Sequence, residues 1–287
     1  MLPMLLVSCN KERFVYVHEE TDKYNLEVNL RYGTSNRNVM DICIPKEQKH
    51  TGVIFYIHGG GWINGDKECY RSSLKSYAEK GYATAAINYR YASSKDHGDD
   101  ILNDIDLALA KLVSYSKETY NYLIDRAMLT GASAGGHLSL LYGYTYADKA
   151  PLEISAIFSN CGPTNLLDNH YFDTSYKFYK NYCSMFSKLL GTKIDATTKE
   201  KNEDLLIHYS PLYFAKNVNI PTAICHGNVD EMVPYQNAID LDNKLTLLNI
   251  KHDFITFNNS GHGLENDQTA SEKADALFNE YVTNYLN

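Results

Sequence analysis

Residues 127–142 read AMLTGASAGGHLSLLY, and this stretch decides the class of fold. A short apolar run leads into the pattern Gly-x-Ser-x-Gly, and a longer apolar run of helical length follows. A strand that turns sharply into a helix needs glycine on both sides of the turn, here Gly131 and Gly135, because larger side chains would collide with neighbouring backbone. The turn also places the serine hydroxyl at a helix N-terminus, where the dipole favours negative charge. Ser133 is therefore the candidate nucleophile.

The stretch His-Gly-Gly-Gly-Trp at 58–62 follows another β-rich run and predicts an oxyanion hole. Three successive glycines leave backbone N–H groups open to the close approach of a substrate. We expect the N–H groups of Gly60, Gly61 and Ala134 to form the hole, with the histidine bracing the loop and Trp62 lining an acyl pocket. A phosphate-binding loop is the competing interpretation, but no Lys-Ser/Thr pair follows and the Gly-x-Gly-x-x-Gly spacing is absent.

Two later segments supply a candidate acid and a candidate base. The segment HGNVDEMVP at 226–234 follows a β-rich run and contains Asp230, with the neighbouring Glu231 as the alternative acid. His262 lies between two glycines directly after the last β-rich run. An acid at the carboxyl edge of a sheet can fix the tautomer of a histidine on the next loop. The order Ser133, Asp230, His262 is the one found where the nucleophile lies on a strand-to-helix turn, and it predicts a catalytic triad.

The rest of the chain alternates between β-rich runs and longer amphipathic stretches. Apolar residues at helical spacing mark the amphipathic stretches, and short runs rich in β-branched residues lie between them. Alternation of this kind predicts the α/β class, with a mostly parallel central sheet and helices on both faces. The predicted strands are 39–44, 52–57, 83–89, 127–129, 154–158, 222–225 and 254–257, and the two clearest helices are 99–114 and 236–248.

One segment, 163–211, has no clear strand and is rich in aromatic residues. It is too long for a tight connection, so we expect it to form helices above the sheet, as a small lid over the site. From it we predict Tyr171, Tyr176, Tyr179 and Phe186 as substrate-binding residues. The alternative is a helix pair that buries these aromatic side chains against itself.

Taken together, these motifs resemble the acetyl-esterase and lipase branch of the α/β-hydrolases, close to hormone-sensitive-lipase-like and Bacteroidetes feruloyl- or acetylxylan-esterase-like proteins. The resemblance implies an α/β-hydrolase fold and a serine esterase that works through an acyl-enzyme. The long N-terminal helical cap of hormone-sensitive lipases is missing, which favours short-acyl esters such as acetylated or feruloylated carbohydrate over long-chain lipids. The matching residues are 58–62, 88–90, 131–138, 210–211, 226–234 and 261–263.

Two other functions stay open at this stage. Arylformamidases and small peptidases cleave amides with the same machinery. A non-catalytic binding protein on a hydrolase scaffold is an alternative of another class, although such proteins typically lose the nucleophile or the base. The predicted mechanism needs no cofactor. We also expect no metal site, because the acidic run at 99–106 lacks the calcium-loop pattern and precedes an apolar helix face.

Composition narrows the choice of partners. The 287 residues include 27 Lys and Arg against 35 Asp and Glu, a net charge of −8. An acidic surface repels a phosphate backbone, so we expect a small-molecule or carbohydrate ester as partner and no nucleic acid. No run is long and apolar enough to span a membrane. Oligomeric state stays open.

The N-terminus permits two interpretations. Leu-Val-Ser-Cys at 6–9 resembles a bacterial lipobox, in which Cys9 would be lipidated and the protein held at the cell envelope. The apolar run before it is short and has no positive charge, so a plain apolar or disordered terminus of a cytoplasmic protein is the alternative. On either interpretation residues 1–12 precede a hydrolase domain that spans 13–287. The six cysteines show no metal-site spacing, and their disulfide state stays open.

Overall fold

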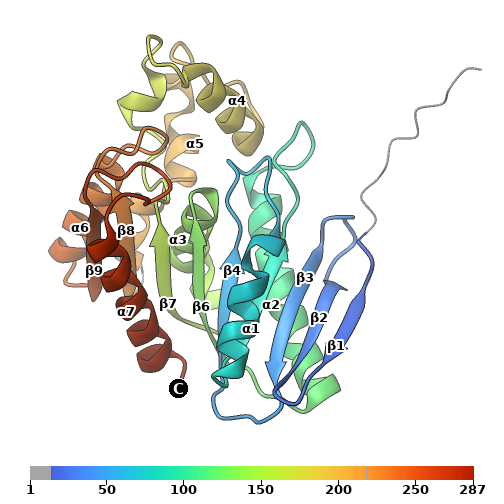
Figure 1. The fold of residues 1–287 in the computed structure, drawn as a ribbon. Coiled ribbons are helices and arrows are strands. Elements are labelled where there is room, and N and C mark those ends of the chain that lie inside the picture. The colour runs from blue at the N-terminus through green and yellow to red at the C-terminus, as the bar shows by residue number, and fades with distance from the viewer. Residues whose placement is uncertain (1–13, 218) are drawn as a thin grey trace, which may run out of the picture.

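A nine-stranded sheet runs through residues 14–217 and 219–287, the part of the chain that the computed structural model describes (Figure 1). The strands are β1 (Val17–Glu20), β2 (Tyr24–Arg31), β3 (Val39–Pro45), β4 (Gly52–Ile57), β5 (Ala83–Asn88), β6 (Arg126–Ala132), β7 (Glu153–Asn160), β8 (Thr222–Gly227) and β9 (His252–Phe257). Their order across the sheet is β1-β2-β3-β5-β4-β6-β7-β8-β9. Pairs from β1 to β5 are antiparallel and all later pairs are parallel, so the prediction of a mostly parallel sheet is confirmed.

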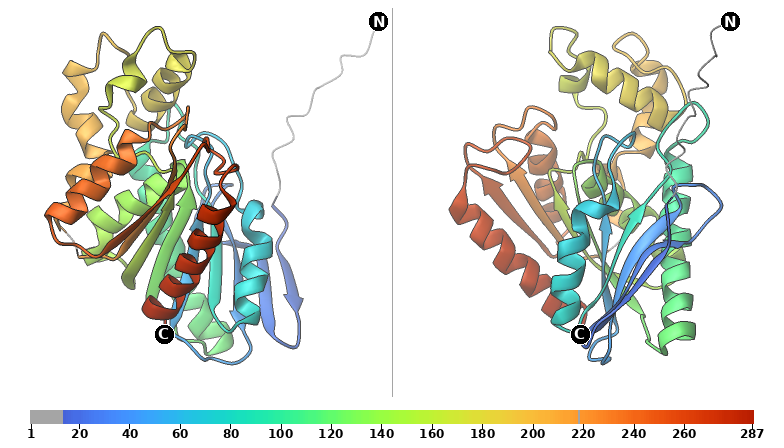
Figure 2. Two further views of the ribbon diagram at one scale, coloured as in Figure 1. Left: turned by 60° about the vertical axis from the view of Figure 1, so that its left-hand side comes forward. Right: turned by 45° about the vertical axis from the view of Figure 1, so that its right-hand side comes forward.

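Helices cover both faces of this sheet (Figure 2). One face packs against α1 and α7, and the other against α2, α3 and α6, each with its own cluster of buried apolar side chains. The central strands β4, β5 and β8 are buried along their whole length, which is why they read as continuous apolar runs. The covering helices are α1 (Arg71–Glu79), α2 (Gly98–Tyr120), α3 (Ala134–Tyr146), α6 (Gln236–Leu247) and α7 (Gln268–Tyr285).

The predicted strands and helices are present with ends shifted by a few residues, but four elements were missed. The antiparallel strands β1 and β2 carry polar side chains in most of their exposed positions, and β1 is exposed throughout. The helices α1 and α7 bury few residues, so their apolar spacing is weak in the sequence. β1 is an edge strand, so burial imposes little pattern on it. β2 is buried along most of its length, so this reason does not extend to it.

Residues 163–211, the roof segment, lie above the carboxyl ends of the central strands (Figures 1 and 2). The segment holds the helices α4 (Tyr179–Leu190) and α5 (Glu203–His208) with short turns between them, and no strand, as predicted. In a parallel sheet the carboxyl edge is where loops meet a ligand. The roof segment therefore stands over the edge at which the predicted triad residues are placed.

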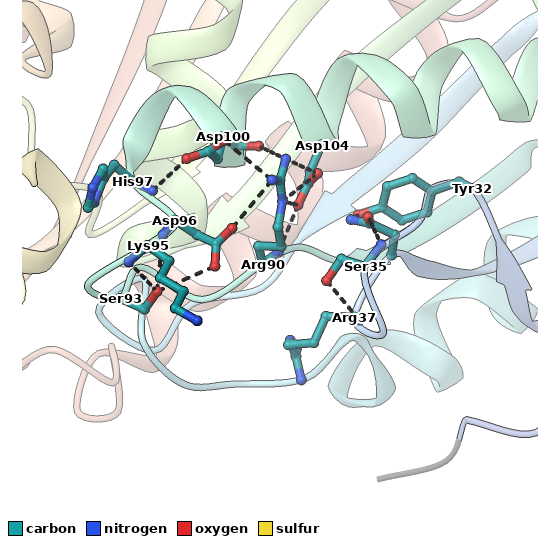
Figure 3. Close-up of polar contacts among 11 residues, drawn as sticks. Tyr32, Ser35, Arg37, Arg90, Ser93, Lys95, Asp96, His97, Asp100 and Asp104 are labelled. Atoms are coloured by element: carbon teal, nitrogen blue, oxygen red, sulfur yellow. Dashed lines mark hydrogen bonds and ion pairs between the residues drawn. The ribbon is translucent and has the colours of Figure 1, made fainter. Parts of the chain in front are cut away.

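Part of the acidic run at the start of α2 is explained by Arg90, two residues after the end of β5 (Figure 3). The guanidinium donates to Asp104 at 2.8–3.1 Å and also pairs with Asp96 and Asp100. Asp104 is fully buried, so this pair fastens the loop after β5 to α2. Asp100 also caps the helix, because its carboxylate accepts from the N–H of His97 at 2.8 Å.

No helix in the described ranges is both long and apolar enough to cross a bilayer. The predicted lipidation site Cys9 and the segment 1–12 lie outside the described residues. The five cysteines inside them are free thiols.

Candidate active site

Ser133 occupies the turn between β6 and α3, where the sequence predicted it. Its φ of 56° and ψ of −123° are rare for a residue with a side chain, so the turn is strained. Two backbone hydrogen bonds hold it: the N–H of Ser133 donates to Asn160 O at 2.8 Å, and its carbonyl accepts from His137 N at 2.9 Å. The half-buried serine side chain lines a cavity together with residues of the roof segment.

The flanking glycines are required by the backbone of β4. A Cβ added to Gly131 would lie 2.3 Å from the carbonyl oxygen of Ile57, and one added to Gly135 only 2.0 Å from the same atom. Neither position tolerates a side chain, because the obstacle is backbone and cannot move aside. The expected steric reason for both glycines is confirmed.

The glycine loop after β4 presents its backbone beside Ser133. Gly60 has a φ of 109° and Gly61 a φ of 59°, both in the region that favours glycine. Within 14–217 and 219–287, neither N–H donates a hydrogen bond to another residue. The N–H of Ala134 is in the first turn of α3, where no intrahelical acceptor exists. All three residues line one cavity with Ser133, so these donors stand where an oxyanion hole would need them.

His58 braces the glycine loop. Its Nδ1 donates to Gly59 O at 2.7 Å, and its Nε2 must accept from the Arg37 guanidinium at 3.3 Å because arginine only donates. The ring stacks on Tyr89 with centroids 4.2 Å apart, and the Tyr89 hydroxyl donates to His58 O at 2.9 Å. Burial lowers the pKa of His58 to about 4, so the ring is neutral and structural.

Asp230 and His262 come together at the carboxyl edge of β8 and β9. Nδ1 of His262 lies 2.7 Å from Oδ2 of Asp230, and 27% of the histidine side chain is exposed while the aspartate side chain is fully buried. The other oxygen, Oδ1, accepts from the N–H groups of Met232 at 2.7 Å and Val233 at 2.9 Å. The carboxylate is thus held by its own loop and has one oxygen aimed at His262.

A second histidine contacts the same carboxylate. Nε2 of His226 lies 3.0 Å from Val233 O and 3.3 Å from Oδ2 of Asp230. Burial would raise the pKa of Asp230, but hydrogen bonds from His226, His262 and the Val233 N–H outweigh it and hold that pKa well below its usual range. Asp230 is therefore an anion at neutral pH.

Cys161, His226 and Asp230 bring one candidate metal-ligand atom each to within 4.8 Å of one another. The carboxylate oxygens of Asp230 are already taken up by two imidazoles and two backbone N–H groups. Burial raises the pKa of the Cys161 thiol well above its usual range, which opposes the thiolate that a metal would need. Both observations argue against a metal ion at this cluster.

Glu231, the alternative acid, points elsewhere. Its side chain is 63% exposed and pairs with the ammonium group of Lys177 on the roof segment. Only Asp230 of the two carboxylates contacts His262 among the described hydrogen bonds.

Ser133 and His262 both open into a cavity of about 420 Å³ under the roof segment. Three of the predicted substrate residues, Trp62, Tyr171 and Phe186, line it and are almost fully buried. The remaining walls are mostly apolar. They are formed by Gly60, Gly61, Ile63, Asn64, Ala134, Pro163, Tyr182, Met185, Met232 and Val233.

Two predicted substrate residues do not line this cavity, and the prediction for them is corrected. The hydroxyl of Tyr176 donates to Glu231 O at 2.6 Å, so the side chain fastens the roof segment to the acid loop. The hydroxyl of Tyr179 accepts from Ala196 N at 3.1 Å, which turns that ring toward the loop after α4. Aromatic density alone does not tell a lining ring from a bracing one.

Tyr182 and Met185 line the cavity but were not predicted to bind substrate. Together with Phe186 they recur at intervals of three and four residues along α4, so one helix face supplies the roof. That spacing is visible in the sequence and could have identified them. Met185 reaches the glycine loop, because a Cβ on Gly61 would lie 2.4 Å from its Sδ.

His137, the other histidine near the nucleophile, is a core residue. Its Nε2 lies 2.7 Å from Tyr209 O, and its Nδ1 accepts from the Trp62 indole at 3.1 Å. Burial lowers the pKa of His137 to about 4, so its ring is neutral, and its hydrogen bond with the indole orients Trp62.

Sequence comparisons show which families and proteins this chain resembles. A sequence model of the BD-FAE family matches residues 40–245, and one of the Dienelactone hydrolase family matches residues 206–287. The probable carboxylic ester hydrolase LipM of Mycobacterium tuberculosis is 29% identical over 231 residues, which cover 75% of this chain and 50% of the relative. The probable isoprenylcysteine alpha-carbonyl methylesterase ICMEL1 of Oryza sativa subsp. japonica is 26% identical over 259 residues, which cover 80% of this chain and 55% of the relative. The chain thus spans about half the length of these curated relatives.

Among solved structures, the truncated form of a carbohydrate esterase from gut microbiota matches with a TM-score of 0.69 at 23% identity, covering 93% of this chain and 100% of that one. At 23% identity this structural similarity shows the fold alone. Because the BD-FAE model matches well over half of the 287 residues, this chain belongs to the BD-FAE family, and its fold is that of the α/β-hydrolases.

Proposed function

We propose that the protein is a serine carboxylic-ester hydrolase that acts through an acyl-enzyme. The observation that carries the proposal is the meeting of Ser133 and His262 on one cavity, with His262 held by the buried anion Asp230. Gly60 and Gly61, whose N–H groups have no acceptor among the residues that the structure describes, line the same cavity. Curated relatives named as ester hydrolases support this class of reaction.

The hydrogen bond to Asp230 decides which nitrogen of His262 can act as base. Asp230 is an anion and only accepts, so Nδ1 of His262 carries the proton and Nε2 is the free acceptor. Nε2 takes the proton of the Ser133 hydroxyl as its oxygen attacks the ester carbonyl carbon. Asp230 then stabilises the imidazolium, since it is itself never protonated in the cycle.

The attack places negative charge on the former carbonyl oxygen. N–H groups of Gly60, Gly61 and Ala134 stabilise this oxyanion, each contributing roughly 3–4 kcal/mol by comparison with similar donors. As the tetrahedral intermediate collapses, His262 gives its proton to the leaving alcohol and the acyl group stays on Ser133. Water, deprotonated by the same histidine, attacks the acyl-enzyme and releases the acid.

The cavity favours a short acyl group. Its roof, formed by Tyr182, Met185 and Phe186, is fastened over the glycine loop, and Trp62 closes the inner wall. A longer chain gains about 0.8 kcal/mol for each buried methylene only where an apolar tunnel exists to receive it. We therefore propose acetyl to about butyryl esters of bulky alcohols, such as acetylated carbohydrate.

Covalent labelling tests the proposal directly. A fluorophosphonate probe should label the wild-type protein and should not label Ser133→Ala. The matched control is Ser139→Ala, six residues along the same segment, which removes a buried hydroxyl that bonds to Gly135 O and to no other described residue. Ser133→Ala should lose turnover on the order of 10⁴-fold or more while its thermal unfolding stays that of the wild type. Labelling that survives in Ser133→Ala would refute the assignment.

Substrate panels then separate the finer claims. kcat/KM measured across acyl chains from two to sixteen carbons should fall beyond about four carbons, and rates that still climb past eight would exclude a short-acyl enzyme. An aryl amide matched to the best ester tests amide cleavage, and a faster amide would make the protein an amidase.

A further inference from the structure

His262 also lines a second hollow of about 430 Å³, which we call the outer hollow. It shares two lining residues, Met232 and His262, with the cavity that contains Ser133. The two hollows therefore meet at the histidine. The outer hollow is lined by Phe178, Val229, Glu231, Met232, Asn259, Gly261, His262, Glu265 and Asn266.

The linings of the two hollows differ in chemistry. The inner cavity is walled mainly by aromatic and aliphatic side chains and by the glycine loop. The outer hollow combines two carboxylates and two amides with one aromatic ring, Phe178. A site of this composition suits a ligand with several hydroxyl groups. Carboxylates accept hydrogen bonds from hydroxyls, amides both donate and accept them, and an aromatic ring can cover the less polar face of the ligand.

The direction of proton transfer decides which part of an ester lies there. His262 must protonate the leaving oxygen, so that oxygen is on the side of Nε2 when the bond breaks. The carbonyl oxygen is directed to the glycine loop instead. The alcohol part of the substrate thus extends past His262, and the acyl part stays beneath the roof segment.

We propose that the outer hollow is the alcohol subsite, and that the carboxylate of Glu265 selects uncharged polyol alcohols over anionic ones. The proposal rests on the esterase function proposed above and adds the chemistry of the leaving group. None of its nine lining residues is a lysine or an arginine.

The charges around the hollow set the direction of the selection. Glu231 is paired with Lys177, so its charge is largely offset. Glu265 makes no ion pair among the described residues, and one of its oxygens accepts from the N–H of Gly261 at 3.2 Å. Its other oxygen lies 2.8 Å from where a Cβ of Gly263 would be, so the carboxylate lies over the loop that carries His262. An anionic alcohol would meet this unpaired charge.

The experiment compares two substrates with one acyl group and one ring. Methyl glucopyranoside and methyl glucuronopyranoside, each acetylated at the same hydroxyl, differ only in a CH₂OH group against a carboxylate. At low salt we expect kcat/KM to be about three- to tenfold higher for the neutral ester, a modest factor because exposed charges are screened by water. Raising the salt to about 0.5 M should narrow the ratio.

Variants at Glu265 locate the effect. Glu265→Gln keeps an acceptor for Gly261 N–H and removes the charge, so it should bring the ratio close to one. Glu265→Lys should invert it. The matched control is Glu272→Lys on α7, which changes the net charge equally but lies outside the hollow and should keep the wild-type ratio. Because each ratio compares two substrates on one enzyme, a general effect on His262 cancels.

Each outcome decides between the alternatives. A ratio of one in the wild type, or a ratio that Glu265→Lys and Glu272→Lys change equally, would overturn the charge selection. If p-nitrophenyl acetate is hydrolysed by way of Ser133 while neither sugar ester is, the esterase function stands and the polyol subsite is wrong. If no ester is hydrolysed, the proposed function fails and this proposal fails with it.

Discussion

Replacing Tyr182 by phenylalanine is expected to slow turnover without weakening substrate binding. The ring of Tyr182 lines the inner cavity, and its hydroxyl donates to the carbonyls of Glu231 at 3.1 Å and Met232 at 3.0 Å. The same short loop directs the N–H groups of Met232 and Val233 at Asp230. The hydroxyl therefore ties the roof of the cavity to the peptide groups that hold the acid of the triad.

The expected size follows from the one hydrogen bond that is lost. The phenol has a single proton shared between two carbonyls, and Glu231 O keeps the Tyr176 hydroxyl as a donor. Loss of a bond of this kind costs about 1 kcal/mol of unfolding free energy. If the loosened loop loses the same amount of transition-state stabilisation, kcat falls about fivefold. KM should stay nearly constant, since the ring still lines the cavity.

Tyr171→Phe is the matched comparison. Tyr171 lies in the same roof segment and lines the same cavity, but its buried hydroxyl has no partner among the described residues. Removing an unsatisfied buried hydroxyl should leave stability equal or slightly higher and kcat within about twofold. Urea unfolding and steady-state kinetics on a short-acyl ester measure both effects. If the two variants lose kcat equally, or if Tyr182→Phe raises KM alone, the coupling of roof and acid is wrong.

Three further results are expected. Asp230→Asn should reduce kcat/KM by about 10³- to 10⁴-fold, because an amide favours the wrong tautomer of His262, whereas Glu231→Gln should reduce it less than tenfold. The reverse ranking in steady-state kinetics would assign the acid of the triad to Glu231. Gly61→Ala should lower kcat far more than the free energy of unfolding, because the new methyl group strains a φ of 59° and collides with Met185 in the roof. Wild-type kcat in this variant would show that Gly61 is not part of the oxyanion hole. The free energy of unfolding should fall as pH drops from about 6.5 to 4. Burial holds the pKa values of His58 and His137 near 4 in the folded protein, below their ordinary value, so in this range the unfolded chain binds protons that the folded chain does not. The loss should be roughly 3 kcal/mol of unfolding free energy for each histidine. Urea midpoints measured across that range should show the loss, and a flat profile would mean that the two rings accept protons in the fold.

Local chemistry explains why so much of the site could be predicted from the sequence. The glycines around Ser133 are required by one carbonyl of β4. Because this requirement is local to the turn, it leaves the Gly-x-Ser-x-Gly pattern in the sequence whatever the rest of the surface is like. The glycine loop and the order of serine, aspartate and histidine have the same origin, because each residue follows its own strand at one edge of the sheet. Buried central strands likewise read as continuous apolar runs. The α/β class and the candidate triad could therefore be predicted from the sequence alone.

Contacts between distant segments were beyond the reach of the sequence. Tyr176 and Tyr179 look no different from Tyr182 in the sequence, and only packing shows that one ring lines the cavity while the others brace the roof. The choice of Asp230 over Glu231 is also tertiary. It depends on which carboxylate a loop from the next strand reaches, and two neighbours on a chain can face opposite ways.

The sequence by itself determined the fold class, the elbow of Ser133 and the members of the candidate triad, because strand alternation and backbone sterics act between neighbours along the chain. The tertiary structure alone decided the shape of the inner cavity, the fastening of the roof to the acid loop and the outer hollow beside Glu265. These features form where the roof segment meets loops far from it in the chain. Their geometry depends on how close those segments approach one another, which no local pattern encodes.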